Sequence, residues 1–209
     1  MTVIASIHDK KNNKTLYTHD GRITAWSEIV WENEDKIIRS KYFHILYSWS
    51  THIEKLISYK NLEKIHDLYI EDDKDMYALI EIILNLLRED ISFTAHHEMA
   101  SESKWRYQWE FIIVTPKMQK AFNLLWEEIY FKQILDDYEI AVLWSWSHIF
   151  EWILITSLKN GKSIEESIEL AWKITAEKIF SCNSNYKIYN TDQIQLPEPH
   201  LNEKLSNNL

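Results

Sequence analysis

Two blocks of strand-like sequence, each followed by helix-like sequence, constrain the fold of this 209-residue chain more than any other feature. The first block opens with a hairpin, because residues 2–8 and 15–20 are rich in alternating β-branched positions and flank the turn-forming segment 10–14. Further strands of this block are predicted at 23–30 (a short pair), 36–39 and 42–48. The second block contains strands predicted at 107–116, 121–125, 127–131 and 138–144.

Helical periodicity follows each block. Apolar residues at spacings of three and four predict an amphipathic helix over 75–90, and a shorter helix is predicted over 50–59. Two more helices are predicted over 147–159, ending at Asn160-Gly161, and over 164–180, opened by a capping box of Ser163 and Glu166. This order predicts an α+β fold in which two antiparallel sheets pack face to face between helix pairs, a four-layer αββα sandwich.

Composition narrows the classes of protein to which this chain can belong. The chain is long enough for one domain, predicted over 1–190, and a polar segment with two prolines, 191–209, is interpreted as a C-terminal tail. A net charge of -9 without a cluster of basic residues argues against nucleic acid as a partner. A single cysteine and no signal-peptide pattern favour the cytoplasm. The apolar run 141–158 is interrupted by His148 and Glu151, so we expect no membrane span.

Thr2 is the first candidate for chemistry. We expect Met1 to be removed, which leaves Thr2 with a hydroxyl nucleophile and a free α-amine able to act as its base. A threonine at this position is common, so it carries little weight alone. Asp20 ends the return strand of the hairpin and Lys36 begins the next strand; a lysine near a nucleophile lowers its pKa, and a buried aspartate keeps that lysine charged.

Five stretches share the order and spacing of a known family. They are T-V-I-A-S-I, D-G-R-I-T-A, D-K-I-I-R, Y-S-W-S-T and W-S-W-S, which begin at positions 2, 20, 35, 47 and 144. In these stretches the sequence resembles the proteasome β-subunits and the bacterial HslV-type peptidase, which are threonine proteases of the N-terminal nucleophile hydrolase class. The resemblance runs from position 2 to about position 190, and it implies the four-layer sandwich of that class.

The resemblance also implies roles for individual residues. Thr2 matches the nucleophile of the family, Asp20 and Lys36 match its charged pair, and Ser145 matches the serine that supports the α-amine. The backbone N–H at Trp49 matches the oxyanion position.

The late stretch EKIFSCNSN resembles the bacterial branch of the family more than the eukaryotic one. It places Glu177 where the family has an aspartate, and Cys182 where it has a threonine. The longer side chain of Glu177 leaves an acidic role plausible.

The implied activity is endoproteolysis by an acyl-enzyme route that needs no metal or organic cofactor. The resemblance further implies a homo-oligomeric ring that encloses its active sites and receives unfolded protein from an ATP-dependent AAA+ unfoldase. Within the sequence itself, the pair His96-His97 with Glu98 does not suggest a metal site, because adjacent strand histidines point to opposite faces and no third ligand has suitable spacing.

The tryptophans conflict with this family. The chain has ten tryptophans and two glycines, whereas average usage predicts about fifteen glycines. The tryptophans at glycine positions of the family are Trp26, Trp49, Trp144, Trp146 and Trp152, with Trp31 and Trp126 as further cases. We interpret them as UGA codons that the source cell reads as glycine. Trp105 and Trp109 match no glycine, and Trp144 with Trp146 could instead form one face of a genuine strand.

Two alternatives to a protease stay open. A genuine Trp49 would fill the cleft and favour a non-catalytic, proteasome-like scaffold or interaction subunit. An unrelated aromatic-rich binding module, in which Thr2 is incidental, is the second alternative. Retention of Met1 would exclude catalysis, because the nucleophile would lose its amine base.

Overall fold

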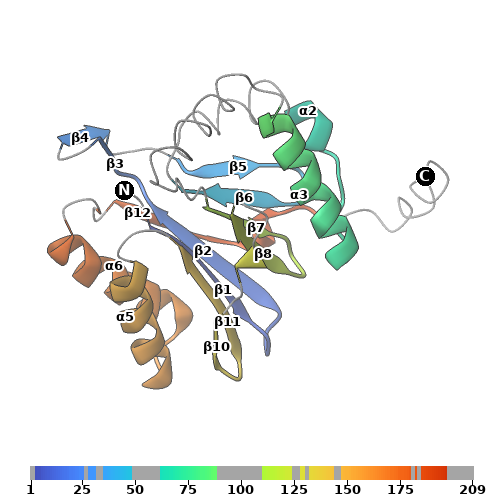
Figure 1. Ribbon diagram of the computed structural model, residues 1–209. Helices are drawn as coiled ribbons and strands as arrows, with labels where there is room; N and C mark the ends of the chain where they lie inside the picture. The colour runs from blue at the N-terminus through green and yellow to red at the C-terminus, as the bar shows by residue number, and fades with distance from the viewer. Residues whose placement is uncertain are drawn as a thin grey trace.

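Two antiparallel five-stranded sheets form the centre of the fold (Figure 1). The computed structural model describes residues 3–25, 28–31, 35–48, 62–88, 110–123, 128–129, 132–143, 147–179, 182 and 185–196. Sheet I has, in spatial order, β10 (Lys132–Leu135), β11 (Tyr138–Leu143), β1 (Ile4–Asp9), β2 (Lys14–Asp20) and β12 (Tyr186–Asn190). Sheet II has β5 (Ile37–Arg39), β6 (His44–Tyr47), β7 (Glu110–Val114), β8 (Gln119–Asn123) and β9 (Glu128–Ile129).

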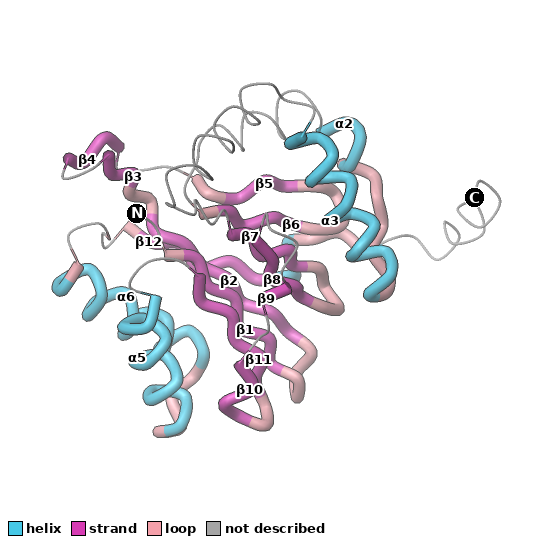
Figure 2. Tube along the Cα trace, viewed as in Figure 1, coloured by secondary structure: helices cyan, strands magenta, loops and turns pink. Residues whose placement is uncertain are grey.

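Helices cover the outer face of each sheet, as Figure 2 shows. Against sheet I lie α5 (Ser147–Lys159) and α6 (Ile164–Lys178), and against sheet II lie α2 (Leu62–Ile65) and α3 (Asp73–Arg88). A separate two-stranded hairpin consists of β3 (Ile23–Ala25) and β4 (Glu28–Trp31), and a short 3-10 helix, η2, spans Thr191–Gln193. The predicted four-layer αββα sandwich is therefore confirmed.

Successive side chains of each central strand point to opposite faces of its sheet, so each strand can pack against two layers. In β1, Ala5 and Ile7 pack with α5 and α6, whereas Ile4 faces the other way, into the core between the sheets. In β7, Ile113 packs with α3, while Ile112 points between the sheets. A strand that is buried on both faces is covered by another layer on each side. Apolar residues therefore occupy both the helix-facing and the sheet-facing positions of these strands.

The helix ends follow the predicted signals. Gly161 has a φ of +80°, which only glycine adopts without strain, and Lys162 N–H donates to Ser157 O at 3.2 Å to close α5. At the start of α6, Ser163 Oγ accepts from Glu166 N–H, and Glu166 Oε2 accepts from Ser163 N–H. The Asn160-Gly161 stop and the capping box are both confirmed, so the α5–α6 pair has a fixed connection.

Several boundaries differ from the predictions. The hairpin of β1 and β2 and the short pair β3–β4 are confirmed. No strand is predicted over 186–190, yet β12 forms the edge of sheet I beside β2. The predicted tail begins at 191, but Thr191 and Ile194 are buried, because this segment packs against the sheets. The helix predicted over 50–59 lies outside the described residues.

Trp172 in α6 anchors the helix layer to sheet I. Its side chain is fully buried, stacks against Tyr186 and donates from Nε1 to Thr18 Oγ1 on β2 at 2.8 Å. A buried indole needs such a partner for its N–H. Within the described parts of the chain, no helix has both the length and the apolar character needed to cross a bilayer.

One polar contact between the sheets predicts a pH dependence of stability. Burial lowers the pKa of His44 on β6 to about 4, and Arg39 adds to the effect. The imidazole is therefore neutral at pH 7, and its Nδ1 is hydrogen-bonded to the Tyr17 hydroxyl of β2. In the unfolded chain a histidine has a pKa near 6.5 and takes up its proton first, so the contribution is complete above pH 6.5 and is lost as the pH falls toward 4.

We expect the free energy of unfolding to fall by about 3 kcal/mol from this group between pH 7 and pH 4. Urea denaturation of wild type and His44→Gln across this range measures the effect. The variant should show a shallower decline, and equal declines in the two proteins would contradict the assignment.

Candidate active site

The candidate site lies where three strand ends meet: the start of β1, the end of β2 and the start of β5. Asp20 is the last residue of β2, and Lys36 directly precedes β5 of the opposite sheet. The β1–β2 pairing continues one step beyond β1, because Asp20 N–H donates to Val3 O at 3.3 Å. Val3 N–H in turn donates to Asp20 Oδ1 at 3.3 Å. The Asp20 carboxylate is thus fixed by the backbone of the third residue of the chain.

Lys36 and Asp20 form a buried ion pair. Lys36 Nζ lies 2.8 Å from Asp20 Oδ1, and the ammonium also donates to Arg22 O at 2.8 Å. The exposed fraction is 0% for Asp20 and 3% for Lys36. Charged side chains are rarely buried this completely unless they are paired and hydrogen-bonded. The structure thus brings together two of the residues that the sequence singles out.

The electrostatics of the pair depend on both partners. Burial raises the pKa of the Asp20 carboxyl, while the Lys36 ammonium and the hydrogen bond from Val3 act in the opposite direction. Asp20 Oδ2 is buried and accepts no hydrogen bond from the described residues. A buried carboxylate oxygen without a partner is uncommon. It leaves one acceptor at the end of β2 for a further polar group.

A second acid–base contact lies beside the first. His19, which precedes Asp20, is 1% exposed, and its Nε2 lies 3.3 Å from Oδ1 of Asp35. Asp35 precedes Lys36, and its Oδ2 accepts from Arg39 Nη1 at 2.8 Å. Burial alone would raise the pKa of Asp35, but the nearby His19 imidazole and the hydrogen bond from Arg39 outweigh it and lower the pKa to about 2. Two adjacent contacts therefore join the end of β2 to the start of β5.

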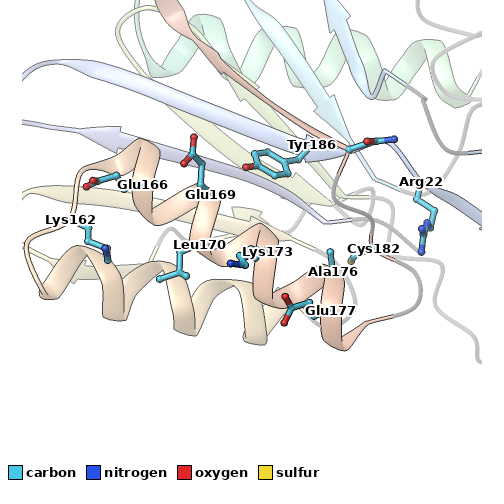
Figure 3. A pocket seen from close by; sticks show the side chains of 11 residues that line it. Arg22, Lys162, Glu166, Glu169, Leu170, Lys173, Ala176, Glu177, Cys182 and Tyr186 are labelled. Carbon is cyan, nitrogen blue, oxygen red and sulfur yellow. The ribbon is translucent and has the colours of Figure 1, made fainter.

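The remaining predicted site residues have different positions. Thr2, Trp49 and Ser145 lie outside the described residues. Glu177 is exposed on α6, where it lines a groove of about 960 Å³ together with Arg22 and the buried Cys182 (Figure 3). This groove adjoins the ion pair through Arg22, whose carbonyl accepts from Lys36. We find no hydrogen bond from Glu177 to Asp20 or Lys36 in the described part of the chain.

Sequence reasoning missed His19, Asp35 and the backbone partners of the ion pair. The backbone groups of Val3 and Arg22 leave no side-chain signature. For the other two, a signal exists: His19-Asp20 and Asp35-Lys36 are adjacent charged or titratable pairs in complementary order. Among the described residues, no group of three or more His, Cys, Asp or Glu side chains is arranged to hold a metal ion.

Removing the lysine should destabilise the protein in a pH-dependent way. In Lys36→Met the buried Asp20 carboxylate loses its cation, and breaking such a pair typically costs about 3–5 kcal/mol. A buried carboxyl with a raised pKa is penalised where it must ionise, so the loss should be larger at pH 8 than at pH 5. Urea denaturation at both pH values measures it, with Lys162→Met on the exposed surface as the control. Equal losses at the two pH values would contradict the assignment.

Sequence comparison alone leaves the chain unassigned, because it matches neither a family model nor a curated protein. Solved structures do match. HslV from Trypanosoma brucei has a TM-score of 0.64 at 14% identity, over 91% of this chain and 98% of that one. BPH from Thiobacillus denitrificans has a TM-score of 0.68 at 9% identity, over 94% of this chain and 100% of that one.

BPH has also been solved in complex with epoxomicin, and that structure matches with a TM-score of 0.68 at 11% identity, over 91% of this chain and 97% of that one. At such identities the likeness establishes the fold and not the activity. The chain therefore shares the four-layer αββα fold of HslV and BPH, as its sequence predicts.

Proposed function

We propose that this chain is a threonine-type endopeptidase, the proteolytic subunit of an HslV-like assembly. The observation that carries the proposal is the buried Asp20–Lys36 pair, whose carboxylate is hydrogen-bonded to Val3 N–H at 3.3 Å. Thr2 is the residue before Val3, and consecutive Cα atoms are about 3.8 Å apart. This contact with the residue after Thr2 supports the proposal that the charged pair acts on the N-terminal hydroxyl and α-amine.

The registers of the strands support the other proposed site residues. In the β1–β11 pairing, Ile4 stands opposite Leu143, and in the sequence Thr2 is two residues before Ile4 while Ser145 is two residues after Leu143. On the other sheet, Tyr47 ends β6, and its N–H donates to Lys36 O at 3.3 Å. Position 49 follows two residues later. This connectivity supports Ser145 at the α-amine and the backbone N–H of position 49 at the oxyanion.

The proposed reaction has two stages. The α-amine of Thr2, directly or through a water molecule, takes the hydroxyl proton, and the oxygen attacks the carbonyl carbon of a peptide bond. The Lys36 ammonium stabilises the developing negative charge, and the N–H at position 49 donates to the oxyanion. The C–N bond breaks, and the amine leaves with the proton. Water then hydrolyses the ester that links the peptide to Thr2.

The assembly is part of the same proposal. Likeness to HslV supports a ring of identical subunits that encloses the active sites, supplied with unfolded protein by an ATP-dependent AAA+ unfoldase in the cytoplasm. We further propose that Glu177, in the last turn of α6, supplies the acidic group of the family, and that Cys182, just beyond that helix, takes the position of the family's threonine. Both residues line the groove together with Arg22, and the carbonyl of Arg22 accepts a hydrogen bond from Lys36 of the ion pair.

Replacing the nucleophile tests the catalytic assignment. Thr2→Ala is expected to abolish hydrolysis of a fluorogenic peptide, a loss of at least about 10³-fold, because no other side chain supplies the attacking oxygen. The melting temperature should stay close to that of the wild type, since the substitution removes only a hydroxyl and a methyl group. Activity that persists in the folded variant would refute the site. Thr156→Ala, on the exposed face of α5, serves as the matched control and should retain activity.

We further propose that the tryptophans at family glycine positions are UGA codons read as glycine. Trp152 and Trp172, whose side-chain exposure the structure gives, differ in a way that supports this. Trp172 is fully buried and hydrogen-bonded to Thr18, so a glycine there would leave a large cavity. Trp152 is 71% exposed on α5, where a glycine would leave none.

Peptide mass spectrometry of the protein isolated from its source cells tests this recoding. We expect glycine at positions 26, 49, 144, 146 and 152, and tryptophan at 172. Tryptophan at position 49 would contradict the recoding and favour a proteasome-like scaffold with an occupied cleft.

A further inference from the structure

Asp35 joins the two sheets beside the catalytic pair, and the proposed mechanism does not use it. Its Oδ1 lies 3.3 Å from His19 Nε2 of sheet I, and its Oδ2 accepts from Arg39 Nη1 of sheet II at 2.8 Å. His19 is almost fully buried, and the Asp35 side chain is 39% exposed. The carboxylate therefore connects an interior imidazole to a cation at the sandwich edge.

Two contacts connect the same two segments of chain. His19 and Asp20 are neighbours on one segment, and Asp35 and Lys36 are neighbours on the other. The His19–Asp35 contact measures 3.3 Å and the Lys36–Asp20 contact 2.8 Å. The Lys36 ammonium is held by Asp20 and by Arg22 O, and the His19–Asp35 contact adds a restraint on the backbone at the residue directly before Lys36. Asp35 therefore helps to set the angle at which Lys36 approaches Asp20.

The surroundings of Asp35 limit its movement further. The Tyr47 hydroxyl donates to Asp35 O at 3.2 Å, while Tyr47 N–H donates to Lys36 O. On the other side, the ring of Tyr189 stacks on His19 and lies under the Arg39 guanidinium, 5.4 Å away. Both the backbone and the side chain of Asp35 are thus held. Because the pKa of Asp35 is lowered to about 2, the carboxylate is ionised at any working pH.

We propose that Asp35, together with His19, is a positioning residue that orients Lys36 for catalysis. This inference rests on the proposed function, because Lys36 matters only if the N-terminal nucleophile is active. Asp35 acts through Lys36, so its loss lowers the rate of the chemical step and leaves substrate binding nearly unchanged. A contact that only held the sheets together would instead change stability.

The experiment compares Asp35→Asn with a control that breaks another buried contact between the sheets. Gln119 of β8 hydrogen-bonds to Ser6 of β1 and donates from Nε2 to Glu139 O, away from Lys36. Gln119→Met keeps the side-chain volume and removes these bonds. Steady-state kinetics with a fluorogenic peptide and melting temperatures are measured for wild type and both variants, each with Met1 removed.

We expect Asp35→Asn to lower kcat by about tenfold with KM within about twofold, since small misplacements of a catalytic group cost one to two orders of magnitude. Gln119→Met should lower the melting temperature at least as much and keep kcat near wild type. Asp35→Glu, which restores a carboxylate, should recover most of the lost kcat. If Asp35→Asn does not fold, His19→Gln takes its place, with the same expected kcat loss.

The outcomes separate this inference from the proposed function. An active, Thr2-dependent wild type with an unchanged kcat in Asp35→Asn overturns the positioning role alone. The same is true if both variants lose kcat in proportion to their stability, because the contact would then be structural. A wild type without Thr2-dependent hydrolysis overturns the proposed function and this inference with it.

Discussion

The ion pair of Asp20 and Lys36 is the interaction on which the rest of the site depends. Two charges this deeply buried are unfavourable unless each is hydrogen-bonded, and here the partners are each other, Val3 N–H and Arg22 O. Such an arrangement requires the start of β1, the end of β2 and the start of β5 to lie close together. Its geometry is therefore a direct product of the packing of one sheet on the other.

The apolar layers explain how a short chain keeps that packing. Alternate residues of the central strands face either the helices or the opposite sheet, so three apolar clusters hold the four layers together. Trp172 links the helix layer to β2, and Tyr17 links β2 to His44 of β6. Both contacts are made through the strand that carries Asp20. The helices and the far sheet thus restrain the same strand from opposite sides.

Much of this fold could be predicted from the sequence because periodicity fixes which face of each element is apolar. The strand β12 could not, since its residues are half-exposed at a sheet edge and show little alternation. The burial of Ile194 could not be predicted either, because Ile194 is an isolated apolar residue in a polar segment. Family motifs identified Asp20 and Lys36, but the role of backbone groups at Val3 and Arg22 has no sequence signature. His19 and Asp35 are each next to a residue of that pair in the sequence, but their contact depends on how the two sheets pack on each other.

The most direct test of the central claim is whether the N-terminal residue is a reactive nucleophile beside this pair. Epoxomicin, the compound bound in one of the BPH structures, is a suitable probe. Incubation with the mature protein, followed by peptide mapping, should place a covalent adduct on the peptide that begins with Thr2. The adduct should be absent from Lys36→Met. An unmodified N-terminal peptide, or one that still carries Met1, would contradict the account.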